Sequence, residues 1–315
     1  MKISMIGPGI MPIPPVGWGG VEIFIWDCKN ALEKLGHEIQ IVNTKNVNEI
    51  IKDVNSFEPD FVHLHYDQYC QMMKFINCPA KAITSHYPFL ENPEPGYEWI
   101  LTGLNRSECA IIALTDPIKQ SFINYGGQED NIYVMPFGIE GSDFSFKEKQ
   151  IKYPNKSIYL SKIEPRKRQS LFQGEGLGID FAGNLHDGDF NSSSKEYIGV
   201  WKREEVTDNL TEYASMILLS SSEGHARVCI EGLISGLGLV VSEFATAHLD
   251  LSKPFITVIP EEKIKDYEYL KKEIEKNRKI SLEMRREIRQ YCLDNFVWSA
   301  IVKRYEKIIK QISES

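Results

Sequence analysis

The chain has 315 residues, enough for two domains of ordinary size, and its 42% hydrophobic and 25% charged residues are typical of a globular protein. A net charge of −8 argues against general nucleic-acid binding, which would need a basic surface. Because the six cysteines lack Cys-x-x-Cys spacing and no run of about 18 apolar residues occurs, the sequence predicts neither a zinc or disulfide framework nor a membrane span.

The two ends of the chain bear on where the protein works. The apolar run that follows Met1 is too short for a signal peptide, so we expect a cytoplasmic protein. Residues 263–315 hold 14 Lys and Arg against 9 Asp and Glu, a balance that would allow peripheral contact with anionic lipid. Such a segment is more often the exposed face of surface helices, and we favour that interpretation. Nothing in the sequence indicates an oligomeric state.

Short apolar runs alternate with helical patterns through the first half of the chain. Strands are predicted at 3–6, 39–42, 61–65, 81–84, 110–114 and 132–135, and helices at 21–35 and near 46–55, 68–76, 97–106 and 116–125. This alternation predicts a parallel sheet with helices on both faces, and ligands of such sheets bind at the carboxyl ends of the strands.

Two features fall at those carboxyl ends. A loop rich in Gly and Pro precedes the first helix and closes with Gly19 and Gly20, where a bare backbone could approach a ligand and the helix N-terminus could face phosphate. It is not a Gly-x-Gly-x-x-Gly fingerprint. A loop with a purely structural role is an equally good interpretation of this segment. His63, His65 and His86 close or follow strands and are candidates for the cleft, although a single histidine is more often packed or on the surface.

The second half of the chain predicts a second sheet. Residues 147–155 are charged and break the periodicity, so we place the linker there and the domains at 1–150 and 151–295. Strands are predicted at 157–161, 179–183, 197–201, 216–219 and 239–242, and helices at 204–213, 262–276, 281–295 and 298–312. Asp187 and Asp189 occur in a Gly/Ser-rich segment and are interpreted as turn residues, not metal ligands.

Charged residues cluster at two places in this half. Lys162, Arg166, Lys167 and Arg168 follow a predicted strand, and four cations in seven residues suit an anion such as a diphosphate, although a solvated basic turn is common. Glu223 and Glu231 flank the start of a short predicted helix. The helix N-terminus suits phosphate, and carboxylates accept hydrogen bonds from vicinal hydroxyls, so the arrangement suggests a nucleotide sugar. A solvated loop acid and a helix acid are the simpler alternative.

The whole string from Met216 to Glu243, with Glu-x7-Glu after Ser-Ser, resembles the signature of retaining glycosyltransferases with the GT-B fold, the group called family 4. The resemblance extends over most of the chain, including Gly-Gly-Val-Glu at 19–22, Ile-Thr-Ser-His at 83–86, Pro-Phe-Gly-Ile-Glu at 136–140 and Asn-Phe-Val-Trp at 295–298. It implies an α/β protein of GT-B architecture, in which two Rossmann-like domains face each other across a cleft and a C-terminal helix at 296–315 returns to the N-terminal, acceptor-side domain.

The resemblance also implies roles for individual residues. His86 and Glu223 are assigned to catalysis, beside the transferred sugar. Ser161 and Lys162 replace the family's Gly-Arg, Arg168 replaces a Gly, and His225 and Ala226 stand where Phe and Gly are common. The residues assigned to donor binding are Gly19, Gly20, Lys162, Lys167, Arg168, Trp201, Glu223, His225, Val228 and Glu231, with Arg166 as a further diphosphate ligand, Trp201 near the base and Glu231 on the ribose.

The activity implied is retaining, metal-independent transfer of a hexose-type sugar from a UDP- or GDP-sugar to a glycan or lipid-linked acceptor, as in polysaccharide biosynthesis. No cofactor, metal or nucleic acid is expected. A GT-B sugar-nucleotide epimerase is one alternative. The substitutions at Lys162 and His225 leave a non-catalytic nucleotide-binding or scaffold protein as another.

Overall fold

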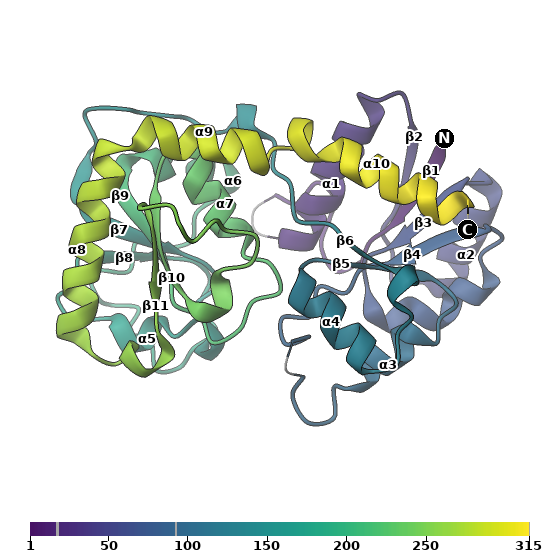
Figure 1. The fold of residues 1–315 in the computed structure, drawn as a ribbon, viewed down its shortest axis with the longest axis horizontal. Coiled ribbons are helices and arrows are strands. Elements are labelled where there is room, and N and C mark those ends of the chain that lie inside the picture. The colour runs from purple at the N-terminus through teal and green to yellow at the C-terminus, as the bar shows by residue number, and fades with distance from the viewer. Residues whose placement is uncertain (17–18, 92, 315) are drawn as a thin grey trace. The chain divides into compact units, whose positions relative to one another are not determined.

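The computed structural model describes every residue except 17, 18, 92 and 315. The chain forms two compact units, each with its own parallel sheet (Figure 1). Unit 1 comprises Met1–Ile139 and Trp298–Ser315, and unit 2 comprises Glu140–Val297. The predicted α/β fold class is confirmed, and so is the return of the last helix to the N-terminal unit.

Unit 1 contains a six-stranded sheet in the order β2-β1-β3-β4-β5-β6. The strands are β1 (Lys2–Ile6), β2 (Glu38–Val42), β3 (Phe61–Leu64), β4 (Ala80–Ile83), β5 (Ala110–Ala113) and β6 (Ile132–Val134). Helices α1 (Gly20–Glu33), α2 (Val47–Phe57), α3 (Trp99–Asn105), α4 (Asp116–Asn124) and α10 (Trp298–Glu314) accompany them, with a 3-10 segment η1 (Asp67–Phe75). Every strand pair is parallel, so the carboxyl ends of β1, β3 and β4 lie at one edge.

Local chemistry explains several helix ends in unit 1. The Asn46 side chain caps α2 by accepting hydrogen bonds from the amides of Asn48 and Glu49, and Thr115 caps α4 in the same way. Gly36 follows α1 with a φ of 87°, the left-handed conformation that glycine adopts most readily after a helix. The sequence alone therefore contains most of the information for these boundaries.

Unit 2 contains a five-stranded parallel sheet in the order β11-β10-β9-β7-β8. The strands are β7 (Tyr153–Leu160), β8 (Ile179–Ala182), β9 (Tyr213–Leu218), β10 (Gly238–Ser242) and β11 (Ile256–Ile259). The helices are α5 (Gln169–Phe172), α6 (Arg203–Asn209), α7 (Arg227–Ile234), α8 (Tyr267–Glu283) and α9 (Arg285–Asn295), and 3-10 turns include η4 (Pro165–Lys167) and η5 (Leu210–Glu212). Gly236 follows α7 with a φ of 81°, at the position expected for a helix-ending glycine.

The structure differs from the predicted elements in unit 2. The strand predicted at 197–201 is wrong, because only one isolated bridge, between Phe181 and Tyr197, forms there. Gly199 has a φ of 91°, which no extended strand has, so the segment turns away after a single pairing. Strand β11 was not predicted, and the segment at 68–76 is a 3-10 helix in unit 1 instead of an α-helix.

The segment expected to link the domains is bound to unit 2. The Ser145 amide donates to the Thr207 carbonyl at 3.0 Å, and the Lys147 amide donates to the Thr211 hydroxyl at 2.8 Å. The Arg285 Nε also donates to the Lys147 carbonyl at 2.6 Å. These contacts explain why unit 2 begins at Glu140, before the boundary expected at residue 150.

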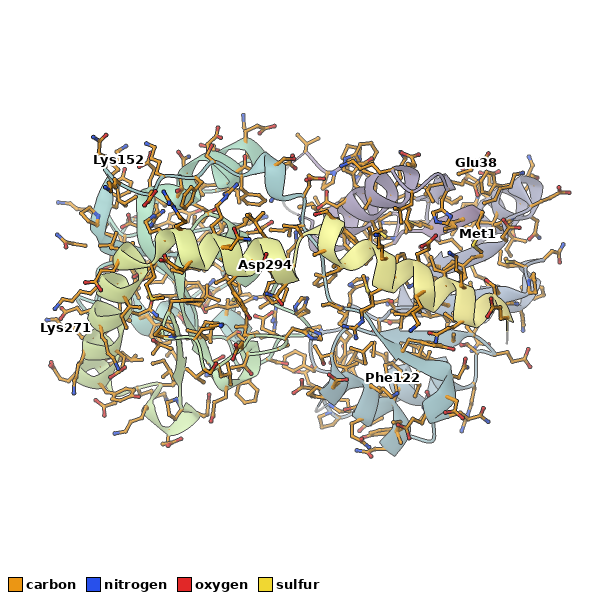
Figure 2. All side chains as sticks on the ribbon, turned by 45° about the horizontal axis from the view of Figure 1, so that its top comes forward. Met1, Glu38, Phe122, Lys152, Lys271 and Asp294 are labelled. Carbon is orange, nitrogen blue, oxygen red and sulfur yellow. The ribbon has the colours of Figure 1, made fainter. Side chains whose placement is uncertain are left out.

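Charged side chains of the C-terminal segment are largely exposed. Lys271 on α8 projects from unit 2, as does Lys152 near the start of β7 (Figure 2). Within the part of the chain that the structure describes, no helix combines the length and the apolar character that a membrane crossing requires.

Candidate functional site

In unit 2 the loops that follow β7 and β9 are bound to each other. These strands are neighbours in the sheet, so both chains leave it at the same edge. The Ser221 amide donates to the Arg166 carbonyl at 2.9 Å. The buried Tyr159 hydroxyl donates to the Lys167 carbonyl and accepts from the Leu219 amide at 3.0 Å. The cationic turn η4 and the loop that carries Glu223 therefore form one assembly.

Glu223 is held by two cations from η4. Lys167 forms an ion pair with its carboxylate, and Arg166 Nη1 lies 3.4 Å from Glu223 Oε1 while it donates to the Ser222 carbonyl at 2.6 Å. Burial raises the pKa of Glu223, but the charges of Lys167 and Arg166 outweigh burial, so that pKa lies below its usual value. Glu223 is therefore ionised at neutral pH, with a buried lysine against it.

Glu231 is held in the same way by two arginines. It lies on α7, where Arg203 Nη1 donates to Glu231 Oε1 at 2.6 Å and Arg227 Nε donates to the same oxygen at 3.2 Å. Burial again raises the pKa, and the two guanidinium groups lower it further than burial raises it, so the pKa of Glu231 is below its usual value. Two buried carboxylates, each between two cations, thus flank the start of α7.

The other predicted cations are placed differently. Lys162 Nζ lies 3.2 Å from Glu164 Oε2, and the opposite oxygen of Glu164 accepts from Arg166 at 2.6 Å, so both cations share this acid beside Glu223. Arg168 forms a bidentate pair with Glu261, at 2.9 and 2.6 Å. The structure thus brings Lys162, Arg166 and Lys167 together and pairs Arg168 with another element.

His225 and Val228 lie at the start of α7. His225 is buried, and its ring centre is 5.1 Å from that of His248. Burial, with the nearby His248 and Arg227, holds the pKa of His225 well below its usual value, so the ring is neutral. Val228 is half-buried in the first turn of the helix.

Trp201 lies elsewhere in unit 2. Its ring centre is 6.2 Å from that of Tyr213, the residue that begins β9. Glu223 follows the other end of this strand, so the structure does not bring Trp201 to the carboxylate cluster. Arg203, two residues further along the chain, does reach that cluster.

Unit 1 presents a second set of candidates at the carboxyl edge of its sheet. Gly19 precedes α1 with a φ of 143°, and a Cβ there would lie 3.0 Å from Glu22 Oε2, so glycine is required. A Cβ on Gly20 would meet nothing within 4 Å, so this backbone is open to a ligand. Residues 17 and 18 of the same loop lie outside the described residues.

The three histidines form a connected network. The Thr84 hydroxyl donates to the Ile112 carbonyl at 2.9 Å, so it accepts from His63 Nε2 at 2.8 Å. His63 Nδ1 then accepts from the Tyr305 hydroxyl of α10, at 2.5 Å. The network continues where the ring centres of His63 and His65 lie 3.9 Å apart and His65 Nδ1 is 3.3 Å from His86 Nε2.

Burial keeps the histidines of this network neutral. It lowers the pKa of His86 to about 3 and holds the pKa of His65 well below its usual value. Phe137 stacks on His86 with ring centres 5.6 Å apart, and Phe24 of α1 contacts both His65 and His86. His86 is therefore fixed in orientation, as a residue that contacts a substrate needs to be.

The sequence did not assign Arg227 or Asp67 to a site, and it placed Arg203 near the nucleotide base without pairing it with Glu231. Arg227 precedes Glu231 by one helical turn, a spacing that could have indicated their ion pair. Arg203 reaches Glu231 only through the tertiary fold, so no local pattern could have found it. Among the described residues, no group of three or more His, Cys, Asp or Glu side chains is arranged to hold a metal ion.

Comparison with known proteins identifies the fold. No family model matches the chain, and no curated protein matches it. Similar solved structures include AviGT4, a glycosyltransferase involved in avilamycin A biosynthesis, at 16% identity, 100% of this chain, 98% of that chain and a TM-score of 0.76. HepE from Anabaena, in complex with UDP and glucose, matches at 13% identity, 98% and 99% coverage and a TM-score of 0.72. Sucrose-phosphate synthase from Thermosynechococcus elongatus matches at 12% identity, 99% of both chains and a TM-score of 0.76. At these identities the likeness concerns the fold, and on that ground this chain has the GT-B fold of glycosyltransferases.

Proposed function

We propose that the protein is a glycosyltransferase that moves a hexose-type sugar from a UDP- or GDP-sugar to a glycan or lipid-linked hydroxyl acceptor. The observation that carries this proposal is the pair of buried carboxylates in unit 2, each held between cations at the start of α7. The GT-B fold and the UDP complexes of HepE support it. Function rests on the site, because one fold serves many activities.

The net charge of the side chains around Glu223 and Glu231 matches the charge of a nucleotide sugar. Around Glu223 and Glu231 lie five cations, Lys162, Arg166, Lys167, Arg203 and Arg227, against three carboxylates, since Glu164 also belongs to the group. Two positive charges remain, which is about the negative charge of the diphosphate in such a donor. A diphosphate would take hydrogen bonds from cations that the fold already holds in place.

The two carboxylates have separate tasks in this proposal. Glu231 accepts hydrogen bonds from the ribose hydroxyls, and Glu223 accepts them from hydroxyls of the sugar that is transferred. Lys167 contacts Glu223 in the structure, so one lysine reaches both the sugar-binding acid and the diphosphate. His86 of unit 1 is proposed to help position the acceptor.

The reaction needs no protein nucleophile. The bond between the anomeric carbon and the diphosphate oxygen breaks, and its electron pair leaves with the nucleoside diphosphate. The acceptor oxygen bonds to the same carbon on the same face, and its proton passes to the departing phosphate. The lysine and arginine side chains stabilise the charge that develops on the leaving group, the task that a metal ion performs in other transferases.

We also propose a cytoplasmic site of action. All six cysteines are free and buried, as suits a reducing compartment. A role in making a polysaccharide would agree with a glycan or lipid-linked acceptor.

A thermal-shift panel of nucleotide sugars tests the proposal. A true donor at about a hundred times its dissociation constant is expected to stabilise the protein by roughly 2.7 kcal/mol. Incubation with that donor and candidate acceptors should release nucleoside diphosphate and a glycosylated product with the donor's anomeric configuration, and excess chelator should leave the rate unchanged. An isomerised donor would indicate an epimerase instead, and binding without any turnover would indicate a non-catalytic protein.

A further inference from the structure

Polar side chains follow three neighbouring strands of unit 1 and meet at one edge of the sheet. Glu22 lies in the first turn of α1, which follows β1. His65 and Asp67 follow β3, and His86 follows β4. Phe24, two residues after Glu22, contacts the rings of both histidines. We call Glu22, His65, Asp67 and His86 the edge cluster.

Three buried atoms of the edge cluster have no hydrogen-bond partner among the described residues. They are His65 Nε2, Asp67 Oδ1 and His86 Nδ1. The His65 side chain is itself buried, with the whole residue 1% exposed. A buried polar atom without a partner costs free energy that a ligand can recover by bonding to it. These three atoms therefore point to a bound molecule.

The proton count of the two histidines limits what that molecule can be. Both rings are neutral, so together they carry two ring protons. One proton lies in the contact between His65 Nδ1 and His86 Nε2. One proton is left for the two outer nitrogens, His65 Nε2 and His86 Nδ1. One of these nitrogens therefore donates a hydrogen bond and the other accepts one. A hydroxyl group both donates and accepts, whereas a phosphate only accepts and an ammonium group only donates.

Buried charge also differs between the units. Among the described residues, the buried Lys and Arg side chains are Lys167, Arg227, Arg278 and Arg285, all in unit 2. In the described part of unit 1 the buried Asp and Glu residues are Glu22 and Asp27, and no Lys or Arg there is buried. An anionic group placed against the edge cluster would meet carboxylates and no buried cation.

We propose that the edge cluster binds the acceptor through neutral sugar-type hydroxyls, and that the reacting part of the acceptor carries no phosphate. This inference rests on the proposed function and adds the chemical class of the acceptor. Asp67 Oδ1 accepts a hydrogen bond from one hydroxyl of the acceptor. Of the outer nitrogens of His65 and His86, one donates a hydrogen bond to a further hydroxyl and the other accepts one. Asp67 also rejects phosphate esters by repulsion between like charges.

Saturation-transfer NMR on the full chain in the presence of UDP tests the acceptor class. The probes are the methyl glycosides of glucose, galactose and mannose, their phosphate esters and the corresponding amino sugars. We expect the neutral glycosides to bind about tenfold or more tightly than the phosphate esters, since like charges repel strongly away from water. Equal or tighter binding of the phosphate esters or the amino sugars, or no binding of the neutral glycosides, would overturn the proposal.

Substitution of Asp67 tests the cluster itself. Asp67→Leu removes the accepting oxygen with little change in volume and should weaken glycoside binding about tenfold, as loss of one hydrogen bond to a charged group does. Asp130→Leu, at an exposed position of the same unit, is the matched control and should bind as the wild type does. Glycoside binding that Asp67→Leu leaves unchanged would overturn the proposal.

Binding of UDP, measured in the same samples, keeps two possible failures apart. Because UDP is proposed to bind unit 2, protease resistance of residues 1–139 equal to that of the wild type is the observation that shows unit 1 of Asp67→Leu to be folded. If wild-type protein did not bind UDP, the proposed glycosyl transfer would be in error, while the preference among glycosides, phosphate esters and amino sugars would still decide the chemistry of the edge cluster.

Discussion

Glu223 and Glu231 are both buried and ionised, yet each has its own cations, and this difference allows their roles to be separated. Glu231→Gln keeps the shape of the side chain but loses the charge that faces Arg203 and Arg227. If Glu231 binds the ribose, this variant should weaken UDP and the intact donor alike, by about 1.5–3 kcal/mol. Isothermal titration with UDP and with the donor measures both values.

Glu223→Gln should behave differently. Its carboxylate is proposed to contact only the transferred sugar, so UDP affinity should stay near the wild-type value or rise, because Lys167 is released from its ion pair. Turnover should fall with little change in UDP binding, since the lost contact strengthens as charge develops on the sugar. Equal loss of UDP affinity in both variants would show that the two acids do not divide the nucleotide sugar in this way.

Asp67 is proposed to bind the acceptor, and its burial is expected to lower the stability of the folded protein. Burial raises its pKa from 3.8 to about 6, and a smaller effect of the Ser85 hydroxyl opposes burial. The folded state therefore binds this proton more tightly than the unfolded state, and ionisation of Asp67 costs about 3 kcal/mol of stability above pH 6. The cost shrinks as the pH falls from 6 toward 3.8 and is lost below that, where the carboxyl is protonated in both states.

Asp67→Asn should thus stabilise the protein near neutral pH and have little effect near pH 4. Urea unfolding of wild type and variant at about pH 7.5 and about pH 4 gives the difference. The exposed Asp130→Asn serves as the control and should change stability at neither pH. A stabilisation by Asp67→Asn that was the same at both pH values would contradict a buried, ionised Asp67.

At the scale of elements, Tyr159 joins two loops of the candidate donor site. Its hydroxyl bonds the Lys167 carbonyl and the Leu219 amide, so Tyr159→Phe leaves both buried groups without this partner. We expect a loss of about 1–3 kcal/mol in stability and weaker UDP binding, because η4 would lose one of the contacts that hold it against the end of β9. Tyr269→Phe, on the half-buried surface of α8, should change neither quantity. Wild-type UDP affinity in Tyr159→Phe would mean that the placement of Lys167 does not depend on this tyrosine.

Helices and strands were predictable where the pattern of apolar residues agrees with the backbone preferences of the residues in the segment. The short apolar runs of both sheets became parallel strands because each is buried on two faces. The segment 197–201 has a suitable alternation but contains Gly199 in a left-handed conformation, and its single bridge shows that the turn decided its structure. Strand β11 lies between Pro254 and Pro260, a pattern that permits an edge strand and could have been recognised.

The sequence could predict which residues belong to the candidate site, but it could not predict which residues they pair with in the fold. The cation run at 162–168 correctly indicated a clustered charge, but the pairing of Arg168 with Glu261 joins residues far apart in the sequence. The same holds for Arg203 and Glu231, and for Tyr305 and His63, which meet because α10 packs in unit 1. Residue types and spacing identify candidates, and tertiary packing selects among them.

For the whole molecule, the structure predicts that unit 1 depends on the last helix of the chain. The yellow helix α10 returns to unit 1 (Figure 1), where it contacts α1 and β4. Its buried side chains are Trp298, Ile301, Val302, Tyr305, Ile308, Ile309 and Ile312. At about 1.5–3 kcal/mol for each large apolar side chain, their burial contributes roughly 10–20 kcal/mol, as much as the whole stability of a typical domain.

A chain that ends at residue 297 should therefore contain an unfolded unit 1. Unit 2 should remain folded, because its sheet and helices all lie within Glu140–Val297. Proteolysis should remove residues 1–139 and leave a resistant fragment that still binds UDP, while glycosyl transfer should be lost with the edge cluster. A chain that ends at Ile312 keeps every buried residue of α10 and should resist proteolysis as the full chain does. If the chain ending at residue 297 kept a protease-resistant unit 1, the stability of that unit would have to come from its own sheet and the helices α1 to α4, and the buried face of α10 would be a minor contribution.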